Sequence, residues 1–509
     1  MDQQKIFKTI YQVAKKEKVD VYVVGGFVRD ELLGKENPSA NAQGKKDLDF
    51  VVTCPQRLTD LHGRRVGSGL EFAKKFDEAV KQTGSLIEFP DFDTARYIIT
   101  PPLIKGGRGD VGQIELEFAG ARTEKYDEKS RKPKVEATTL EEDLKRRDFT
   151  VNTMAVDVRN AKYFENSKLS EVVIDPLGGQ VDLKKKLLRT PLDPDSTFSD
   201  DPLRMMRAAR FASQLGFIIE ANTYSAMERN ASRLKIISAE RIKEELFKIF
   251  TTTKPSIGLR ILYDTGLMDV FMPEVGNLKG VDEIFGQQHK DVLEHTFKVI
   301  DNLAERTDNV LLRVSALFHD IAKPQTKKFE RGRGWTFDMH EHLGKKMVQV
   351  IGKRLKFSTD ESKYLAKLVR WHQHPIALMD DGVTDSAVRR LIVNLGDELT
   401  DLLNLCRSDI TTGNPLKKTK RLKNYDYLEN RIKEVIEKDN LRAFQSPFRG
   451  DEIMTECGLK PGPTVGKIKK ALEEAILEGI IPNDYEATKK YFLKLKDEMM
   501  VGVEEWEKL

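Results

Sequence analysis

The spacing of apolar residues changes partway along the chain, and this change constrains the fold more than any other feature of the sequence. Up to about residue 160, short β-branched runs such as "VDVYVVGG" (19–26) and "DLDFVVT" (47–53) predict strands between helical segments. From "DDPLRMMRAARFASQLGF" (200–217) onward, apolar residues recur every three or four positions and strand patterns nearly disappear. The sequence therefore predicts an α+β protein, in which a mixed-sheet N-terminal part precedes roughly 300 mainly helical residues.

The length of the chain predicts three or four domains. At 509 residues it is too long for a single hydrophobic core. The pattern of apolar residues places approximate domain boundaries near residues 160, 275 and 400. No apolar run approaches the roughly 18 residues of a membrane span, and the three cysteines show no paired spacing. We therefore expect a cytoplasmic protein in a reducing compartment, with no membrane partner.

Two aspartates stand at the start of the second predicted strand. In a strand, Asp47 and Asp49 would point to one face about 6.5–7 Å apart, while Leu48 packs on the other. Hard oxygen ligands in that arrangement suit Mg²⁺, which also binds substrate phosphates. An isolated Asp-x-Asp is more often a polar turn. The Gly25-Gly26 pair and Arg29 upstream favour a phosphate-binding site instead, because glycine lets the backbone approach a ligand closely.

A third carboxylate could join this pair. Glu115 and Glu117 share one face of the strand predicted in "GQIELEFAGAR" (112–122), opposite Leu116 and Phe118. Either glutamate could complete the metal site, and equally both could form the solvent face of an edge strand.

The motifs of the N-terminal half occur in a recognisable order. "GGFVRDELLG…KDLDF" resembles the head-domain signature of class II nucleotidyltransferases, which comprise the CCA-adding enzymes and bacterial poly(A) polymerases. "EEDLKRRDFTVNTMA", "DPLGGQVDLKKKLLRT", "DDPLRMMRAARFASQLGF" and "SAERIKEEL" are similar to the later motifs of that family and follow in the same order. The resemblance covers roughly residues 18–275.

The resemblance implies a template-independent tRNA nucleotidyltransferase. The 3′-hydroxyl of tRNA would attack the α-phosphate of CTP or ATP and release pyrophosphate, with two Mg²⁺ held by Asp47 and Asp49 as the catalytic residues. The nucleotide-binding residues that it implies are Gly25, Gly26, Arg29, Arg147, Asp148, Asn152, Asp201, Arg204, Arg207 and Arg210.

Asp201 and Arg204 would select the base. Three positions apart on a helix, they lie on one face, as in an ordinary salt bridge. An aspartate accepts from the exocyclic amino group of C or A, and an arginine donates to the adjacent ring nitrogen. Uracil and guanine reverse this order. Where the family has Glu, this chain has Asp200, one methylene shorter.

The sequence leaves open which nucleotides, and how many, the enzyme would add to the RNA. The poly(A) group's G-R-(RK)-F-x-x-x-H pattern is absent after the aspartate pair, and "EFAGARTEKY" (117–126) looks like CCA-adding enzymes with an appended HD domain. The segment between Thr123 and Pro133 would be the flexible loop that changes the pocket from C to A. Alternatives are a poly(A) polymerase or a partial enzyme that adds only CC or only A.

Seven of the eight histidines lie between His289 and His374, on helical sequence. Imidazoles with an adjacent carboxylate on facing helices form transition-metal sites. The pattern resembles the HD phosphohydrolase superfamily. That resemblance implies His295, His319 and Asp320 as ligands, completed by His340 or His342, around Ni, Mn, Co, Zn or Mg²⁺.

The HD part has two interpretations. It could be an HD fold without activity, or it could remove a 2′,3′-cyclic phosphate or 3′-phosphate from an RNA end. We also considered that this phosphohydrolase is the main activity. A third hypothesis, a non-catalytic RNA-binding protein, is opposed by the intact aspartate pair.

Two basic segments would bind the tRNA. The net charge of +4 is too small to imply nucleic acid, but basic residues cluster locally. The RNA-binding candidates are Lys417, Lys418, Lys420 and Arg421 in one segment and Lys467, Lys469 and Lys470 in another. We expect a nucleotidyltransferase-type head (1–160), a neck that recognises base and primer (161–275), an HD body (276–400) and a helical tail (401–509).

Overall fold

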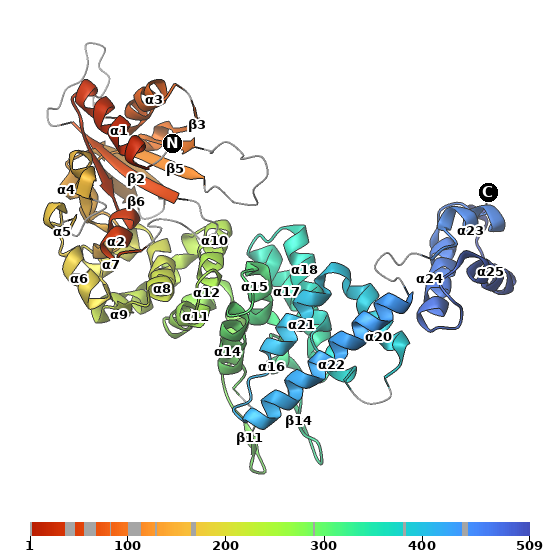
Figure 1. The fold of residues 1–509 in the computed structure, drawn as a ribbon. Helices are drawn as coiled ribbons and strands as arrows, with labels where there is room; N and C mark the ends of the chain where they lie inside the picture. Colours follow the sequence, from red (N-terminus) through yellow and green to blue (C-terminus); the bar gives the residue numbers. More distant parts are fainter. Residues whose placement is uncertain are drawn as a thin grey trace. The chain divides into compact units, whose positions relative to one another are not determined.

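The computed structural model divides into two compact units, Met1–Pro273 and Glu274–Leu509, called here the N-terminal and C-terminal units (Figure 1). It describes residues 3–35, 46–54, 68–81, 83–99, 113–127, 130–163, 169–288, 291–379, 383–439 and 446–508. Among those residues, no helix has the length and apolar character needed to cross a membrane.

The N-terminal unit is built on a mixed six-stranded sheet, counted over its described residues, in the order β3-β4-β5-β2-β1-β8. Strands β2 and β5 run parallel, and the other neighbours are antiparallel. The strands are β1 (Asp20–Val24), β2 (Lys46–Thr53), β3 (Ser85–Phe89), β4 (Thr94–Ile99), β5 (Ile114–Gly120) and β8 (Ala155–Asp157). The prediction of a mixed-sheet head is confirmed.

One face of this sheet is covered by α1 (Gln3–Glu17) and α3 (Gly69–Ala79), as Figure 1 shows. Aromatic rings fill the interface. Phe50 and Phe118 stack at 5.2 Å, and Phe7, Phe72 and Phe76 lie 5.3–5.8 Å from one of these two rings. Rings at such distances interdigitate and bury large apolar areas, so this face forms the core.

Alternation along β2 decides what the other face carries. Leu48 and Phe50 are buried against the aromatic core, whereas Asp47 and Asp49 are exposed on the opposite side. Farther along, Val51 turns to that same side and joins a small apolar cluster with Leu144 and Ala155. On this face of the sheet, the two aspartates therefore lie just beyond the edge of the apolar cluster.

The rest of the N-terminal unit is mainly helical. Helix α2 (Gly26–Leu32) follows β1 directly, and a hairpin of β6 (Arg122–Asp127) and β7 (Ser130–Ala137) precedes α4 (Leu140–Lys145). The remaining elements are α5 (Leu169–Val172), α6 (Gly179–Lys185), β9 (Leu187–Leu188), α7 (Pro194–Asp200), α8 (Leu203–Leu215), β10 (Ile218–Ile219), α9 (Ala221–Asn230), α10 (Ala239–Phe250), α11 (Pro255–Asp264) and α12 (Leu267–Phe271).

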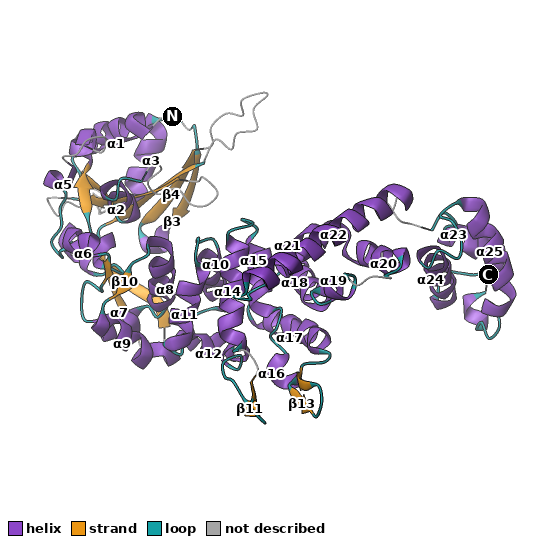
Figure 2. Ribbon diagram, turned by 60° about the horizontal axis from the view of Figure 1, so that its bottom comes forward, coloured by secondary structure: helices purple, strands orange, loops and turns teal. Residues whose placement is uncertain are grey.

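The C-terminal unit is a helical body with two short hairpins, followed by a tail (Figure 2). The body contains β11 (Glu283–Ile284), β12 (Gln287–Gln288), α14 (Val292–Ala304), α15 (Val310–Phe318), α16 (Lys323–Thr326), β13 (Lys328–Glu330), β14 (Gly334–Thr336), α17 (His340–Arg354), α18 (Thr359–Trp371), α19 (His374–Ala377), α20 (Asp385–Leu395) and α21 (Leu399–Ser408). The long α22 (Pro415–Asp439) follows, and the tail comprises α23 (Gly450–Cys457), α24 (Pro463–Leu477) and α25 (Tyr485–Met499). The mainly helical prediction is confirmed, although it missed the hairpins.

Candidate functional site

A row of carboxylates lies on the open face of the sheet. The parallel register of β2 and β5 sets Asp47 beside Glu115 and Asp49 beside Glu117. Neighbouring strands lie about 4.8 Å apart, so side chains on one face of this pair are close. Arg96 on β4 pairs with both glutamates, and its Nη2 lies 3.3 Å from Oε2 of Glu117. The structure thus places both candidate third carboxylates on the face of the aspartates.

Asp49 is electrostatically strained. Its pKa is raised to about 7, first because surrounding protein displaces water from the carboxylate, and next because Glu117 and Asp47 repel its charge. Arg147 and Arg207 oppose the rise. The residue nevertheless keeps an exposed side, so repulsion by the adjacent carboxylates is the cause that we weight most. A cation bound among these oxygens would relieve that repulsion.

Gly25 brings the glycine turn against the aspartates. Its φ is 75° and its ψ −135°, a conformation open to glycine almost alone. A Cβ built there would lie 3.4 Å from Nη1 of Arg147 and 3.6 Å from Oδ2 of Asp49. Backbone, guanidinium and carboxylate therefore meet at one point, as expected for a site that receives nucleotide phosphates.

Asp143 orients Arg147. The Asp143 side chain is fully buried in the first turn of α4 and accepts from Nη2 of Arg146 at 2.7 Å and from Nη2 of Arg147 at 3.2 Å. Burial alone would raise the pKa of Asp143, but the two guanidinium groups hold it below its ordinary value. Sequence reasoning missed this residue, because an Asp in an acidic helix start is typical of capping.

The other predicted nucleotide contacts form a buried network. Nη1 of Arg29 donates to Oδ1 of Asn152 at 2.8 Å, and Asn152 donates to Oδ1 of Asp148 at 3.0 Å. Nε of Arg207 donates to Oδ2 of Asp148 at 2.7 Å. Burial would raise the pKa of Asp148, yet the Arg207 charge and these bonds hold it well below its ordinary value. Arg29, only 4% exposed, joins α2 to this network and does not line the open face.

Asp201 and Arg204 differ from the expected geometry. The prediction that both lie on one helix is wrong: α7 ends at Asp200, α8 begins at Leu203, and Asp201 lies between them. Proline at position 202 disfavours helical backbone in the residue before it, which explains the break. Oδ1 of Asp201 accepts from the Leu203 N–H at 3.1 Å, and the Arg204 guanidinium donates to the carbonyls of Thr197 and Arg146.

Arg210 faces another partner on the neck. Its Nε lies 2.7 Å from Oε2 of Glu245 on α10, and its guanidinium stacks 4.2 Å from the Phe211 ring centroid. Arg29 and Arg207 also lie within 5.5 Å of this ring. Phe211 thus packs three of the predicted arginines around one aromatic side chain.

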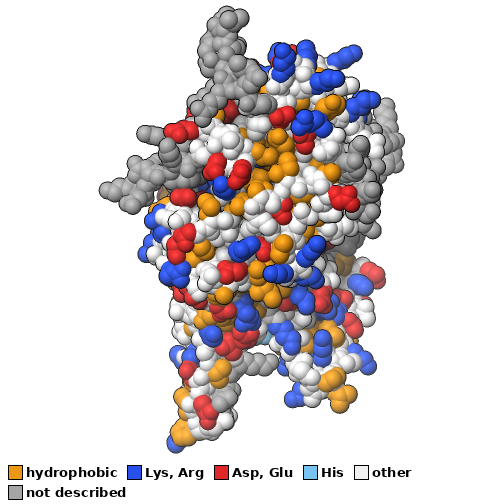
Figure 3. All heavy atoms as spheres, turned by 90° about the vertical axis from the view of Figure 1, so that its left-hand side faces the viewer, with side chains coloured by type: hydrophobic (Ala, Val, Ile, Leu, Met, Phe, Trp, Pro, Cys, Tyr) orange, Lys and Arg blue, Asp and Glu red, His pale blue; other side chains and the backbone are white. Residues whose placement is uncertain are grey.

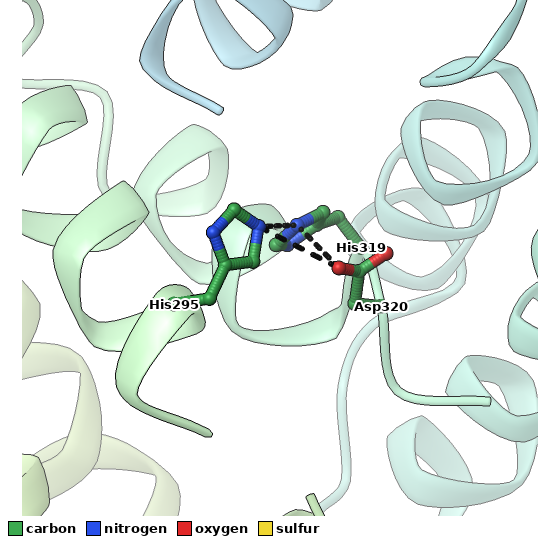
Figure 4. A group of neighbouring side chains, drawn as sticks. All are labelled: His295, His319 and Asp320. Atoms are coloured by element: carbon green, nitrogen blue, oxygen red, sulfur yellow. Dashed lines mark hydrogen bonds and ion pairs between the residues drawn. The ribbon is translucent and has the colours of Figure 1, made fainter. Parts of the chain in front are cut away.

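A second centre lies in the C-terminal unit, where ligand-type side chains gather at helix ends. Two sets that could hold a metal ion occur among the described residues: His295, His319 and Asp320, and Asp320, His340 and His372. Figure 4 shows His295 and His319 directed toward each other and toward Asp320. Oδ2 of Asp320 lies 3.2 Å from Nε2 of His319, and Oδ1 lies 3.4 Å from Nε2 of His340. One carboxylate is therefore shared by two sets.

The histidines are oriented as metal ligands. The Nδ1–H groups of His319, His340 and His372 donate to the backbone carbonyls of residues 316, 337 and 369 at 2.7–2.8 Å. This places a proton on Nδ1, so that in the neutral imidazoles the Nε2 lone pairs face one another, 3.2 Å apart between His340 and His372. Oδ1 of Asp320 is buried without a hydrogen-bond partner. The donor set fits a divalent transition metal.

Two members of this centre were missed by sequence reasoning. His372 lies in the histidine cluster of the sequence but was not among the predicted metal ligands. Asp409 lies just after α21, and its Oδ1 is 2.8 Å from Nε2 of His295. Burial would raise the pKa of Asp409, but the hydrogen bond from His295 and the charge of His319 lower it to about 2. His342, a predicted alternative to His340, lies outside the cluster and is 44% exposed, because two residues on a helix are separated by about 200°.

The remaining predictions lie on surfaces. Residues 417, 418, 420 and 421 are exposed on α22, and residues 467, 469 and 470 on α24. Figure 3 shows a face on which Lys and Arg are interspersed with Asp and Glu. The expected loop between Thr123 and Pro133 falls in the β6–β7 hairpin, and residues 128–129 lie outside the described part.

Comparison with known proteins matches three parts of the chain to family models. Residues 21–189 match the poly A polymerase head domain, residues 216–278 the probable RNA and SrmB-binding site of polymerase A, and residues 292–406 the HD domain. All three matches follow the order of the motifs along the chain.

Relatives and solved structures agree with those models. The chain is 33% identical over 358 residues to the A-adding tRNA nucleotidyltransferase of Deinococcus radiodurans, covering 68% of this chain and 78% of that protein. It is 29% identical over 478 residues to the CC-adding tRNA nucleotidyltransferase of Thermus thermophilus, covering 92% of each. Its fold is similar to that of the Bacillus stearothermophilus CCA-adding enzyme in complex with CTP, with a TM-score of 0.60, 21% identity, and coverage of 98% and 99%.

Proposed function

Because this chain belongs to the class II tRNA nucleotidyltransferases, with a poly A polymerase head domain and an HD domain, we propose that it adds C, C and A to the 3′ end of tRNA from CTP and ATP. The observation that carries the proposal is the carboxylate row on the open sheet face, with Gly25 and Arg147 against it.

The residues have distinct roles in this reaction. Asp47 and Asp49, with Glu117 beside them, would hold two Mg²⁺. When bound, such ions would supply positive charge for the attacking hydroxyl and for the departing pyrophosphate. Arg147, held by Asp143, would contact the triphosphate next to the Gly25 backbone. Asp148 would keep Arg207 in place at the boundary between head and neck.

Asp201 and Arg204 would select C and A. The Arg204 guanidinium is fixed by two backbone carbonyls, so its direction is set before a base arrives. Oδ2 of Asp201 lies 3.6 Å from Nη2 of Arg241, a contact long enough to be exchanged for a base amino group. A preorganised donor beside an available acceptor favours the N3–N4 edge of C and the N1–N6 edge of A.

The test uses three tRNA substrates that end at position 73, 74 or 75, each with one labelled nucleotide. Addition of C to the first two and of A to the third, with a stop after A76, is the expected result. Incorporation of only C or only A would assign a partial enzyme, and an unlimited A tract would assign a poly(A) polymerase. If Asp47→Ala leaves incorporation intact, the assignment of the metal ligands fails.

The basic segments supply a sequence-independent grip on tRNA. Lysines 417, 418 and 420 lie on one exposed helix start, and 467, 469 and 470 on another. Reversing two charges on either helix should weaken tRNA binding uniformly and reduce its salt dependence by about two counterions. An unchanged salt dependence would exclude that helix from the interface.

The second centre supports a second activity, hydrolysis of phosphates at RNA ends. The observation that favours it is the sharing of Asp320 between two ligand sets whose Nε2 atoms converge. Phosphatase activity with Mn²⁺, Ni²⁺, Co²⁺, Zn²⁺ or Mg²⁺ should disappear in Asp320→Asn and persist in Asp47→Ala. The reverse pattern would show that the activity belongs to the head.

A further inference from the structure

The two hairpins of the C-terminal unit lead into the helices that carry the HD ligands. Strands β11 and β12 precede α14, which bears His295 in its first turn, and β13 and β14 lie between Asp320 and His340. The carbonyl of Phe337, just after β14, accepts from Nδ1 of His340 at 2.8 Å. Figures 1 and 2 both show the hairpins projecting from the same side of this unit. Each hairpin is therefore joined along the chain to an element that carries a ligand of the metal-type centre.

Aromatic rings form a continuous row across the two hairpins. The ring centroid of Phe285 lies 6.0 Å from that of Phe329, which lies 5.4 Å from that of Trp335. Nζ of Lys327 stands 5.7 Å from the Trp335 ring. Phe285 is 80% exposed at the outer end of the row. The rings are tilted against one another, by 48° and 75°, so the exposed ring of Phe285 is the one that offers a face to a further planar group.

Phe285 occupies a position that folding alone does not favour. It forms a two-residue turn with Gly286, and both residues have positive φ, 51° and 75°. Hairpin turns of this kind prefer Asn-Gly, because bulky residues are disfavoured at positive φ. Phe285 combines an unfavourable backbone conformation with an exposed aromatic ring. Strain and exposure together indicate a residue kept for contact with a ligand.

Basic side chains lie at the centre and after it along the chain, and the first is Lys323, whose Nζ is 2.6 Å from Oδ2 of Asp320. Among the acidic and imidazole groups of the HD centre, Asp409 is the most exposed, at 25%. Helix α22 begins six residues after it. The exposed Lys417 and Lys418 lie in the first turn of that helix. On the hairpins, Lys327 pairs with Asp282 and Arg333 with Glu330, so charge there is locally balanced. The hairpins themselves therefore favour uncharged planar groups.

We propose that Phe285, Phe329 and Trp335 form a stacking platform for the unpaired nucleobases at the 3′ end of an RNA whose terminal phosphate enters the HD centre. Stacking on aromatic rings tolerates any base, which suits an activity that acts on RNA ends of different sequence. The inference rests on the second activity proposed above. If the exposed ring served a protein partner instead, replacing Phe285 would leave the affinity for single-stranded RNA unchanged.

The test compares Phe285→Asn with Phe285→Tyr in the full-length protein. The probe is a labelled five-nucleotide single-stranded RNA with a 3′-phosphate, measured by fluorescence anisotropy. Asn is the favoured turn residue, so we expect this variant to melt at the same temperature as the wild type or higher, and yet to bind the RNA about tenfold more weakly. The Tyr variant keeps the ring and should bind as the wild type does. Val350→Asn, which removes an exposed apolar side chain on α17, should not change binding.

Two further readouts separate this inference from the activity on which it rests. RNA binding should quench Trp335 fluorescence in the wild type and lose this quenching in Trp335→Phe. With Mn²⁺, Phe285→Asn should raise KM for the RNA 3′-phosphate and leave hydrolysis of p-nitrophenyl phosphate unchanged. Equal RNA affinity of the wild type and Phe285→Asn would overturn the platform. Wild-type protein that hydrolyses neither substrate but binds RNA through Phe285 would overturn the HD activity alone.

Discussion

The sharpest test of the head site is an alanine at Gly25. The Cβ would meet Arg147 at 3.4 Å and Asp49 at 3.6 Å, which are tight but tolerable contacts. Space is therefore not the main obstacle. The main obstacle is the backbone conformation, because φ 75° with ψ −135° costs an L-residue about 1–3 kcal/mol.

Two outcomes of this strain can be calculated. If the turn keeps its shape, the melting temperature of the head should fall by about 2–12 °C, at roughly 2–4 °C per kcal/mol for a unit of this size. If the turn relaxes, Arg147 and Asp49 are displaced and kcat/KM for nucleotide addition should fall about 5- to 150-fold. We expect a mixture of the two effects.

The neighbouring glycines provide the controls. Gly26 lies within α2, where alanine favours the helix by about 1 kcal/mol, and its Cβ would meet only the Arg29 guanidinium at 3.5 Å. Gly26→Ala should therefore keep stability while raising KM for the nucleotide, if the backbone approaches the phosphates here. Gly34, with φ 66° and open space around its Cβ position, should lose stability on conversion to Ala without a change in KM. Thermal melts and steady-state kinetics measure both quantities. A Gly25→Ala variant with wild-type stability and kcat/KM would refute the reasoning.

Three other predictions address charged groups. Asp143→Asn should destabilise the head by about 3–5 kcal/mol at pH 7, because it breaks a buried ion pair. Since the pKa of Asp143 is lowered in the folded protein, the stability difference between wild type and variant should shrink as the pH falls below 3.8, the ordinary pKa of an aspartate. Urea unfolding measures this difference. In Mn²⁺ titrations, Asp320→Asn should lose both metal sets, His340→Ala one of them and His342→Ala neither; equal stoichiometry in all three would contradict the shared carboxylate. Asp49→Asn should raise the melting temperature in the presence of EDTA while abolishing nucleotide addition, since it removes a charge repelled by two neighbouring carboxylates; a lower melting temperature would contradict that repulsion.

Local periodicity was sufficient to predict the open face of the sheet. Alternation along one strand separates Asp47 and Asp49 from Phe50, and the aromatic core then fixes which side remains uncovered. The strands β3 and β4 were not predicted, because "SLIEF" and "TARYII" are short and gain their stability from pairing with each other and with β5. Nothing in their own sequence distinguishes them from loop segments with a few apolar residues.

The failures at the sites share one cause, which is that spacing along the chain does not report contact in space. His342 was considered because it is close in sequence to His340, although the helix turns it away. Asp409 was missed because 89 residues separate it from Asp320, and only the packing of α14 against α21 brings it to His295. At Asp201, a following proline ended the helix on which the base-reading geometry had been built.

Both centres hold electrostatic arrangements that the polypeptide alone does not favour. In the head, Asp47, Asp49 and Glu117 carry like charges on adjacent strand positions, an arrangement that destabilises a sheet. In the HD centre, the Nδ1–H bonds of His340 and His372 mean that, when both imidazoles are neutral, their Nε2 lone pairs face each other at 3.2 Å. In the head, Arg147 and Arg207 offset only part of the repulsion, since the pKa of Asp49 is still raised. Each arrangement becomes favourable once a cation lies between the facing atoms, because the same oxygens and nitrogens that repel one another then act as ligands. We infer that the fold gives up stability at these two places in order to hold metal ions, and that chelation should lower the melting temperature of each unit.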